Sequence, residues 1–227
     1  MKNTTRSVKQ SAWKELPRYF LLIVLLALVA LFTALTPSFI KFSNLMDILR
    51  TASAFGILAI AFMMVQATGE MNFTFAAQAA MGAILLGLFM LRLPYLLSIV
   101  LALAIVTISG LPPAFIVIHW KAPAFIITMG FMTIYTGVLK ILTNNTILYK
   151  NEWGEMYTAL SRGSVAGIPV PIIIFLVVAV VVHLFFERTR TGRYIFAVGA
   201  NQTACRQVGV NVPRIRYIAY LLCSLLA

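Results

Sequence analysis

Four polar, uncharged side chains lie together where one apolar run ends and the next begins. Gln66, Asn72, Thr74 and Gln78 fall within the stretch QATGEMNFTFAAQ. Polar groups inside a membrane are costly and often mark a transport pathway. Their amides and hydroxyls are suited to hydrogen bonding with a hydroxylated solute. If residues 66–78 form a broken or re-entrant element, Asn72 and Thr74 line a cavity; an ordinary turn with polar capping residues is the alternative.

A second polar stretch, residues 197–216, is basic and contains two glycines. Asn201 is a good helix N-cap and Gly209 a good helix stop, so residues 202–208 are expected to form about two turns of helix. Pro213 interrupts the chain before the next apolar run. Both a solvated connecting loop and a short helix that docks on a partner fit this pattern.

The motifs of common catalytic and metal sites are absent from the sequence. It contains no G-x-x-x-x-G-K-[ST] for ATP, and no H-E-x-x-H, C-x-x-C or G-x-S-x-G. The two cysteines, Cys205 and Cys223, predict no disulfide framework. The six acidic residues form no visible pair for acid–base chemistry. We therefore expect no enzyme activity, no catalytic residues, no metal and no bound cofactor.

The composition places the chain in a membrane. It has 227 residues, of which 61% are hydrophobic and 11% charged, whereas soluble domains are about one quarter charged. The net charge of +12 is attributed to positively charged cytoplasmic loops rather than to nucleic-acid binding. The predicted fold class is an all-α, polytopic bundle of transmembrane helices in a single domain.

Long apolar runs define the expected spans. They cover residues 19–36, 51–67, 71–91, 93–120, 122–139, 163–186 and 217–227. About 20 residues cross the hydrocarbon core, so the first six predict complete spanning helices. The seventh is too short as it stands and predicts only the start of another helix.

Basic residues predict the orientation. With the N-terminus in the cytoplasm, 12 of the 18 Lys and Arg residues lie inside and six outside, as the positive-inside rule favours. Residues 1–18 then form a basic cytoplasmic tail and 19–227 the transmembrane domain. Within it, 187–216 is a cytoplasmic loop and 143–162 an extracytoplasmic loop.

Residues 188–212 resemble the cytoplasmic loop of ribose-type ABC importer permeases. The matching positions are Thr189, Arg190, Gly192, Arg193, Ala197, Gly199, Asn201, Ala204, Gly209, Asn211 and Val212. Cys205 stands where a second alanine is usual, and Val210 where isoleucine is usual. Weaker similarities cover 122–137 and 167–175, so the resemblance extends from about residue 45 onward.

This resemblance implies a membrane subunit with the architecture of the vitamin-B12 importer's permease, in the bacterial inner membrane. It implies a second permease subunit, a separate ATPase subunit that binds ATP, and an extracytoplasmic solute-binding protein. The short helix would couple to the ATPase. The implied coupling residues are Gly199, Asn201, Gln202, Ala204, Arg206, Gly209 and Val210.

One segment departs from the family pattern. Where the family commonly reads G-G-I-D-L-S-V-G, this chain has Glu70 in the second position, Asn72 for aspartate and Thr74 for serine. Family members have about three more helices, so the chain is expected to be C-terminally truncated. A sugar importer is the main interpretation. The alternatives are a branched-chain amino-acid or nucleoside ABC permease, or a self-contained secondary transporter or channel.

Overall fold

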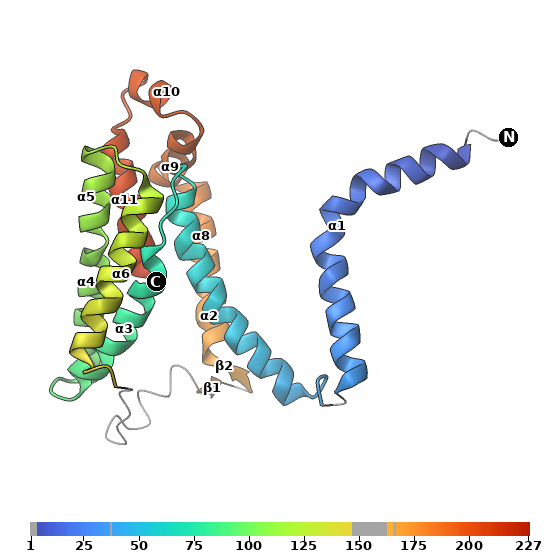
Figure 1. Ribbon diagram of the computed structural model, residues 1–227, viewed down its shortest axis with the longest axis horizontal. Coiled ribbons are helices and arrows are strands. Elements are labelled where there is room, and N and C mark those ends of the chain that lie inside the picture. The colour runs from blue at the N-terminus through green and yellow to red at the C-terminus, as the bar shows by residue number, and fades with distance from the viewer. Residues whose placement is uncertain (1–3, 37, 147–162, 166) are drawn as a thin grey trace. The chain divides into compact units, whose positions relative to one another are not determined.

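The computed structural model describes residues 4–36, 38–146, 163–165 and 167–227, and most of them are helical (Figure 1). The helices are α1 (Thr4–Leu35), α2 (Phe42–Gln66), α3 (Thr74–Met90), α4 (Tyr95–Ser109), α5 (Leu111–His119), α6 (Ala124–Leu142), α8 (Val170–Arg188), α9 (Arg190–Ala200), α10 (Gln202–Gln207) and α11 (Val212–Leu226). The β structure described is one short antiparallel pair, β1 (Ser164–Val165) with β2 (Ile168–Pro169). The predicted all-α class is confirmed.

The chain divides into two units, Met1–Leu49 and Arg50–Ala227. In the first unit, the rings of Phe32 and Phe39 stack with centroids 5.7 Å apart. The Asn44 side-chain amide donates a hydrogen bond of 2.8 Å to the Phe39 carbonyl. These contacts shape the turn between α1 and α2.

Helix α1 is longer than the apolar run that predicted it. The run covers 19–36, but the helix begins at Thr4. Residues 4–18 include Lys, Gln, Ala, Leu and Glu, which have high helix propensity. The polar residues before position 19 lie outside the apolar run, but they continue the same helix. The tail 1–18, expected as a separate segment, is helical from Thr4 onward.

Among the residues that the structure describes, four helical segments are long and apolar enough to cross a membrane: Phe42–Gln66, Tyr95–His119, Ala124–Leu142 and Val170–Arg188. They match the predicted runs 51–67, 93–120, 122–139 and 163–186. The runs 19–36 and 71–91 correspond to shorter apolar helices, Tyr19–Leu35 and Thr74–Met90. All six predicted runs thus fall on helices, but the predicted number of complete spans is not confirmed.

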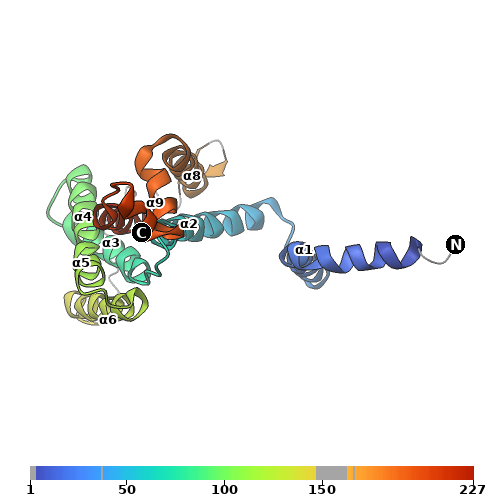
Figure 2. The same ribbon diagram turned by 90° about the horizontal axis from the view of Figure 1, so that it is seen from above.

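Helix α11 lies at the centre of the second unit. Figures 1 and 2 place α3 to α6 on one side of it and α2, α8 and α9 on the other. The main apolar core joins α2, α5, α8, α9 and α11 and includes Met64, Ala114, Phe186, Ile195 and Tyr220. Helix α8, by contrast, leaves Leu176, Val177, Val180 and Val181 exposed, as expected of a surface that faces lipid.

The predicted extracytoplasmic loop 143–162 lies mostly outside the described residues, because the structure describes it only as far as Thr146. Its predicted position relative to the membrane stays a prediction.

The end of α9 packs closely against the turn that follows α2. A Cβ atom added to Gly199 would lie 2.2 Å from the Ala67 carbonyl oxygen. On the other side of this contact, Gly69 has a φ of +84°, which favours glycine. The backbone of α9 therefore packs directly against the backbone of this turn, and no flexible side chain lies between them that could move aside.

We predict that Gly199→Ala lowers the thermal unfolding temperature by roughly 5 °C, because overpacking against a fixed carbonyl costs about 2 kcal/mol. A thiol-reactive dye can follow unfolding, since Cys205 and Cys223 are both buried. Gly137→Ala is the matched control, because a Cβ there meets nothing within 4 Å. Equal unfolding temperatures for the two variants would contradict the packing described.

Candidate functional site

The segment between α2 and α3 is not helical, and it runs alongside α11. Helix α2 ends at Gln66, a turn follows at Gly69, and α3 begins only at Thr74. Glu70 contacts Arg216 near the start of α11, whereas Asn72 contacts Cys223 near its end. Residues 70–72 therefore follow α11 over about two of its turns. Non-helical backbone inside a membrane protein must be buried in protein or line water.

Asn72 and Thr74 are fully buried and bonded to each other. The Asn72 side-chain oxygen accepts hydrogen bonds from the Thr74 backbone N–H at 3.0 Å and from the Thr74 hydroxyl at 2.7 Å. The Asn72 amide nitrogen donates to the Cys223 sulfur at 3.3 Å. One asparagine thus supports the first turn of α3 and joins it to α11.

Gln78 extends this network across three helices. It is fully buried, and its amide nitrogen donates to the Ser109 hydroxyl at 3.0 Å and to the Ser224 hydroxyl at 2.9 Å. These partners end α4 and α11 respectively. An amide buried in apolar surroundings is stable only when its hydrogen bonds are made. Gln78 therefore holds α3, α4 and α11 together.

Glu70 forms an ion pair with Arg216 at the start of α11. The Arg216 Nη2 atom contacts the Glu70 carboxylate, and the two side chains are only 10% and 12% exposed. The Tyr220 hydroxyl donates to the other carboxylate oxygen at 3.3 Å. Burial raises the pKa of Glu70, and the charge and hydrogen bond of Arg216 lower it in part. Because burial is the larger effect, the pKa of Glu70 lies above its ordinary value despite the nearby Arg216.

One face of α11 makes all of these contacts. Arg216, Tyr220, Cys223 and Ser224 are separated by four, three and one residues, which places them along one side of a helix. They meet Glu70, Asn72 and Gln78 in chain order. We call this set of seven residues the α11 seam.

The predicted short helix is confirmed as α10, directly before α11. The Asn201 side-chain oxygen accepts a hydrogen bond of 3.0 Å from the Ala204 N–H, which caps the helix. Gly209 ends it with a φ of +80°. The Asn211 side chain then caps α11 by accepting from the Arg214 N–H at 3.1 Å. Only four residues separate α10 from α11.

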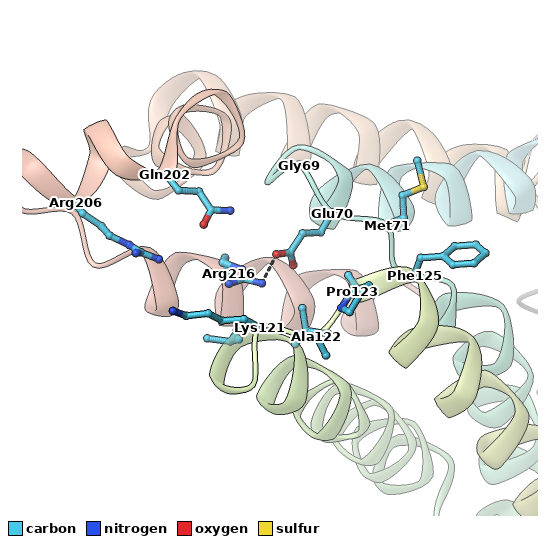
Figure 3. Close-up of a pocket in the computed structure, with 13 residues that line it drawn as sticks. Gly69, Glu70, Met71, Lys121, Ala122, Pro123, Phe125, Gln202, Arg206 and Arg216 are labelled. Carbon is cyan, nitrogen blue, oxygen red and sulfur yellow. Dashed lines mark ion pairs between the residues drawn. The ribbon is translucent and has the colours of Figure 1, made fainter.

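A cavity of about 660 Å³ lies between α10, the start of α11, the turn after α2 and the turn between α5 and α6. Its polar lining comes from Glu70, Lys121, Gln202, Arg206 and Arg216 (Figure 3). Gln202 and Arg206, two of the predicted coupling residues, therefore face the same space as the ion pair.

The structure brings most of the predicted site residues into two groups. Asn72, Thr74 and Gln78 lie in the α11 seam or bond to it, whereas Gln66 is exposed at the end of α2 and does not join them. The predicted coupling residues form one continuous surface segment. In chain order they are Gly199 near the end of α9, Asn201 as the N-cap of α10, Gln202, Ala204 and Arg206 on α10, and Gly209 and Val210 after it.

The sequence did not predict which residues form the ion pair or which residues bond to Asn72 and Gln78. Glu70 was noted only as a departure from a motif, and Arg216 only as a cytoplasmic charge. Tyr220, Ser224 and Ser109 were counted as parts of apolar runs. The spacing of Arg216, Tyr220 and Ser224 at intervals of four residues was the available signal. Within the described residues, no group of three or more His, Cys, Asp or Glu side chains is placed to hold a metal.

We predict that Glu70→Gln and Arg216→Gln each lower the unfolding free energy by roughly 3 kcal/mol, since each leaves a buried group without its charged partner. The double variant should lose less than the sum of the two, with a coupling energy of roughly 2 kcal/mol. Arg214→Gln, an exposed charge on the same helix, is the control and should change little. Strictly additive losses would rule out the ion pair as a stabilising contact.

The chain was compared with known proteins. Residues 44–227 match the family model described as branched-chain amino acid transport system / permease component. The ribose import permease protein RbsC of Escherichia coli K12 is 32% identical over 209 residues, covering 91% of this chain and 65% of that protein. RbsC of Haemophilus influenzae is 30% identical over 230 residues, covering 100% and 71%.

The autoinducer 2 import system permease protein LsrD of Enterobacter sp. strain 638 is 27% identical, over 88% of this chain and 63% of that protein. The chain thus spans about two thirds of the length of the curated relatives it matches. No solved structure matches it. Because the family model covers most of the chain, the chain belongs to the family of branched-chain amino acid transport system permease components.

Proposed function

We propose that the chain is the membrane-spanning permease subunit of an ABC importer for a sugar or a related small polar solute. Its relatives include ribose import permeases. The observation that carries the proposal is the fold of residues 188–212, where the resemblance is strongest. They form α9 and the capped helix α10, packed at Gly199 against the turn that leads to the buried polar network.

The proposed architecture is that of the vitamin-B12 importer's permease, with six complete spanning helices and the start of a seventh. Residues 1–18 form a cytoplasmic tail, 187–216 the cytoplasmic coupling loop and 143–162 an extracytoplasmic loop. The location is the bacterial inner membrane, with a second permease subunit alongside. A membrane-impermeant thiol reagent that reaches Thr203→Cys from outside intact cells would contradict this orientation.

We further propose that α10 receives motion from a separate ATPase subunit, while an extracytoplasmic binding protein delivers the solute. The chain itself needs no catalytic residue, because the partner binds ATP. Motion of α10 passes into α11 through the short connection at Asn211. The α11 seam then carries it to residues 70–78 through an ion pair and hydrogen bonds rather than through apolar contacts alone.

The same network is the proposed solute pathway. Asn72, Thr74 and Gln78 carry amide and hydroxyl groups that a sugar hydroxyl can match. On α11, Asn72 bonds to Cys223 and Gln78 bonds to Ser224, whereas Thr74 bonds to Asn72. Displacement of α11 would free one amide donor each of Asn72 and Gln78, so that a solute replaces the lost partners. Gln66 belonged to the predicted pathway but lies apart from this network.

We expect a cysteine introduced as Gln202→Cys to crosslink to the partner ATPase, because Gln202 lies on the proposed docking helix. Cys205→Ala removes the neighbouring native thiol and restores the residue usual in the family. Thr146→Cys, on the proposed opposite side of the membrane, is the control. If no crosslink forms at residue 202 in any nucleotide state, the coupling role fails.

We also expect Asn72→Ala and Thr74→Ala in the complete transporter to lower uptake at least tenfold, since each loses a buried hydrogen bond worth roughly 1.5 kcal/mol and its solute contact. Uptake of labelled ribose and other sugars would be measured, with leucine and a nucleoside in parallel. Gln66→Ala is the control and should leave uptake unchanged.

Two results of these uptake assays would change the account. Leucine or nucleoside uptake in place of sugar uptake would favour the alternative ABC permeases. Uptake by the chain without any ATPase would favour a secondary transporter or channel.

A further inference from the structure

The cavity beside α10 has an excess of positive charge. Among its lining residues, Lys121, Arg206 and Arg216 are cationic and only Glu70 is anionic, which leaves two net positive charges. In Figure 3 the side chains of Lys121, Arg206 and Gln202 extend into the space beside the ion pair. Polar side chains from α10, from the turn between α5 and α6 and from the start of α11 thus line one space.

These cations have unused capacity to bind an anion. Among the residues that the structure describes, no ion pair or hydrogen bond engages the side chain of Lys121 or Arg206. Arg216 is 8% exposed, and its Nε atom is buried without a hydrogen-bond partner. Arg216 is engaged with Glu70, so Lys121 and Arg206 are the cavity cations that can bind an added anion.

The cavity also has an apolar lining. Met71, Val117, Ile118 and Phe125 line it together with the charged residues. A free inorganic anion would make no favourable contact with these apolar side chains. A molecule with a charged end and an apolar end complements both the cationic and the apolar lining residues. The volume of about 660 Å³ lies in the range of pockets that hold small organic ligands, roughly 300–1,000 Å³.

Trp120 places the cavity at the membrane surface. It follows α5, precedes Lys121 and is 72% exposed. The membrane-length segments Tyr95–His119 and Ala124–Leu142 meet at this turn. Exposed tryptophan at the end of a spanning helix is typical of the headgroup level of a bilayer. Lipid phosphates occur at that level, and basic pockets between helices bind anionic headgroups.

We propose that this cavity binds the headgroup of an anionic phospholipid, with Lys121 and Arg206 contacting its phosphate and the apolar lining contacting its glycerol and upper acyl chain. The proposal requires only that the chain spans a membrane, and it does not depend on the proposed coupling to an ATPase. Bound lipid would bridge α10 to the turn between α5 and α6.

The test is native mass spectrometry of the purified chain in detergent. It would be titrated with phosphatidylglycerol, with phosphatidylcholine of the same acyl chains, and with inorganic phosphate. Phosphatidylglycerol should bind most tightly. Lys121→Gln/Arg206→Gln should weaken its binding roughly 25-fold, because each cation near an anionic lipid contributes about a factor of five.

Matched variants separate the cavity from general surface charge. Arg188→Gln/Arg190→Gln removes the same charge outside the cavity and should retain binding. Lys121→Arg/Arg206→Lys should also retain it, and this variant decides the question if the glutamine variant fails to fold. Equal loss in the cavity variant and the outside variant would overturn the proposal.

Three further outcomes would overturn it. Phosphatidylcholine bound as tightly as phosphatidylglycerol would exclude recognition of the anionic headgroup. Inorganic phosphate that displaces the lipid at equal concentration would show a site for free anions. Release of the lipid when the ATPase is added would assign the cations to an acidic surface of that partner.

Discussion

Glu70 and Asn72 lie in the non-helical stretch between α2 and α3, and Gln78 lies in the first turns of α3. These polar side chains need partners within a bundle of apolar helices, and α11 supplies them. Near the start of α11, the ion pair joins Glu70 to Arg216. Near the end of α11, Asn72 and Gln78 form hydrogen bonds with Cys223 and Ser224. Charges this well buried cannot separate cheaply. The position of α11 therefore sets the position of the whole segment.

The rest of the second unit is arranged around that constraint. Helix α10 precedes α11 by a four-residue connection, and α9 packs through Gly199 on the turn before Glu70. The turn after α2 thus contacts α9 through Gly199, and residues 70–78 contact α11. An ATPase that moves α10 would act on the polar network through both contacts, which gives the proposed importer a direct route from ATP to the solute pathway.

Hydropathy was sufficient to locate the apolar helices, because apolar runs of membrane length have few alternatives to helix. It did not indicate the polar first part of α1 or the helix α9. Local capping chemistry was sufficient for α10, since Asn201 and Gly209 act on their own neighbours. The partners of Asn72 and Gln78 could not be predicted, because Cys223 and Ser224 lie about 150 residues away and look like small core residues in sequence. The predicted grouping of Gln66 with Asn72 relied on proximity in sequence, and the turn at Gly69 separates them.

The most direct test of the account is charge reversal across the ion pair, measured as ATP-driven uptake by the complete transporter. Glu70→Arg and Arg216→Glu alone should each abolish uptake, because like charges would then meet in a buried site. Combined in one chain, they should recover a substantial part of it at comparable expression. A double reversal no more active than either single reversal, or single reversals with normal uptake, would contradict the claim that this contact links α11 to the segment 70–78.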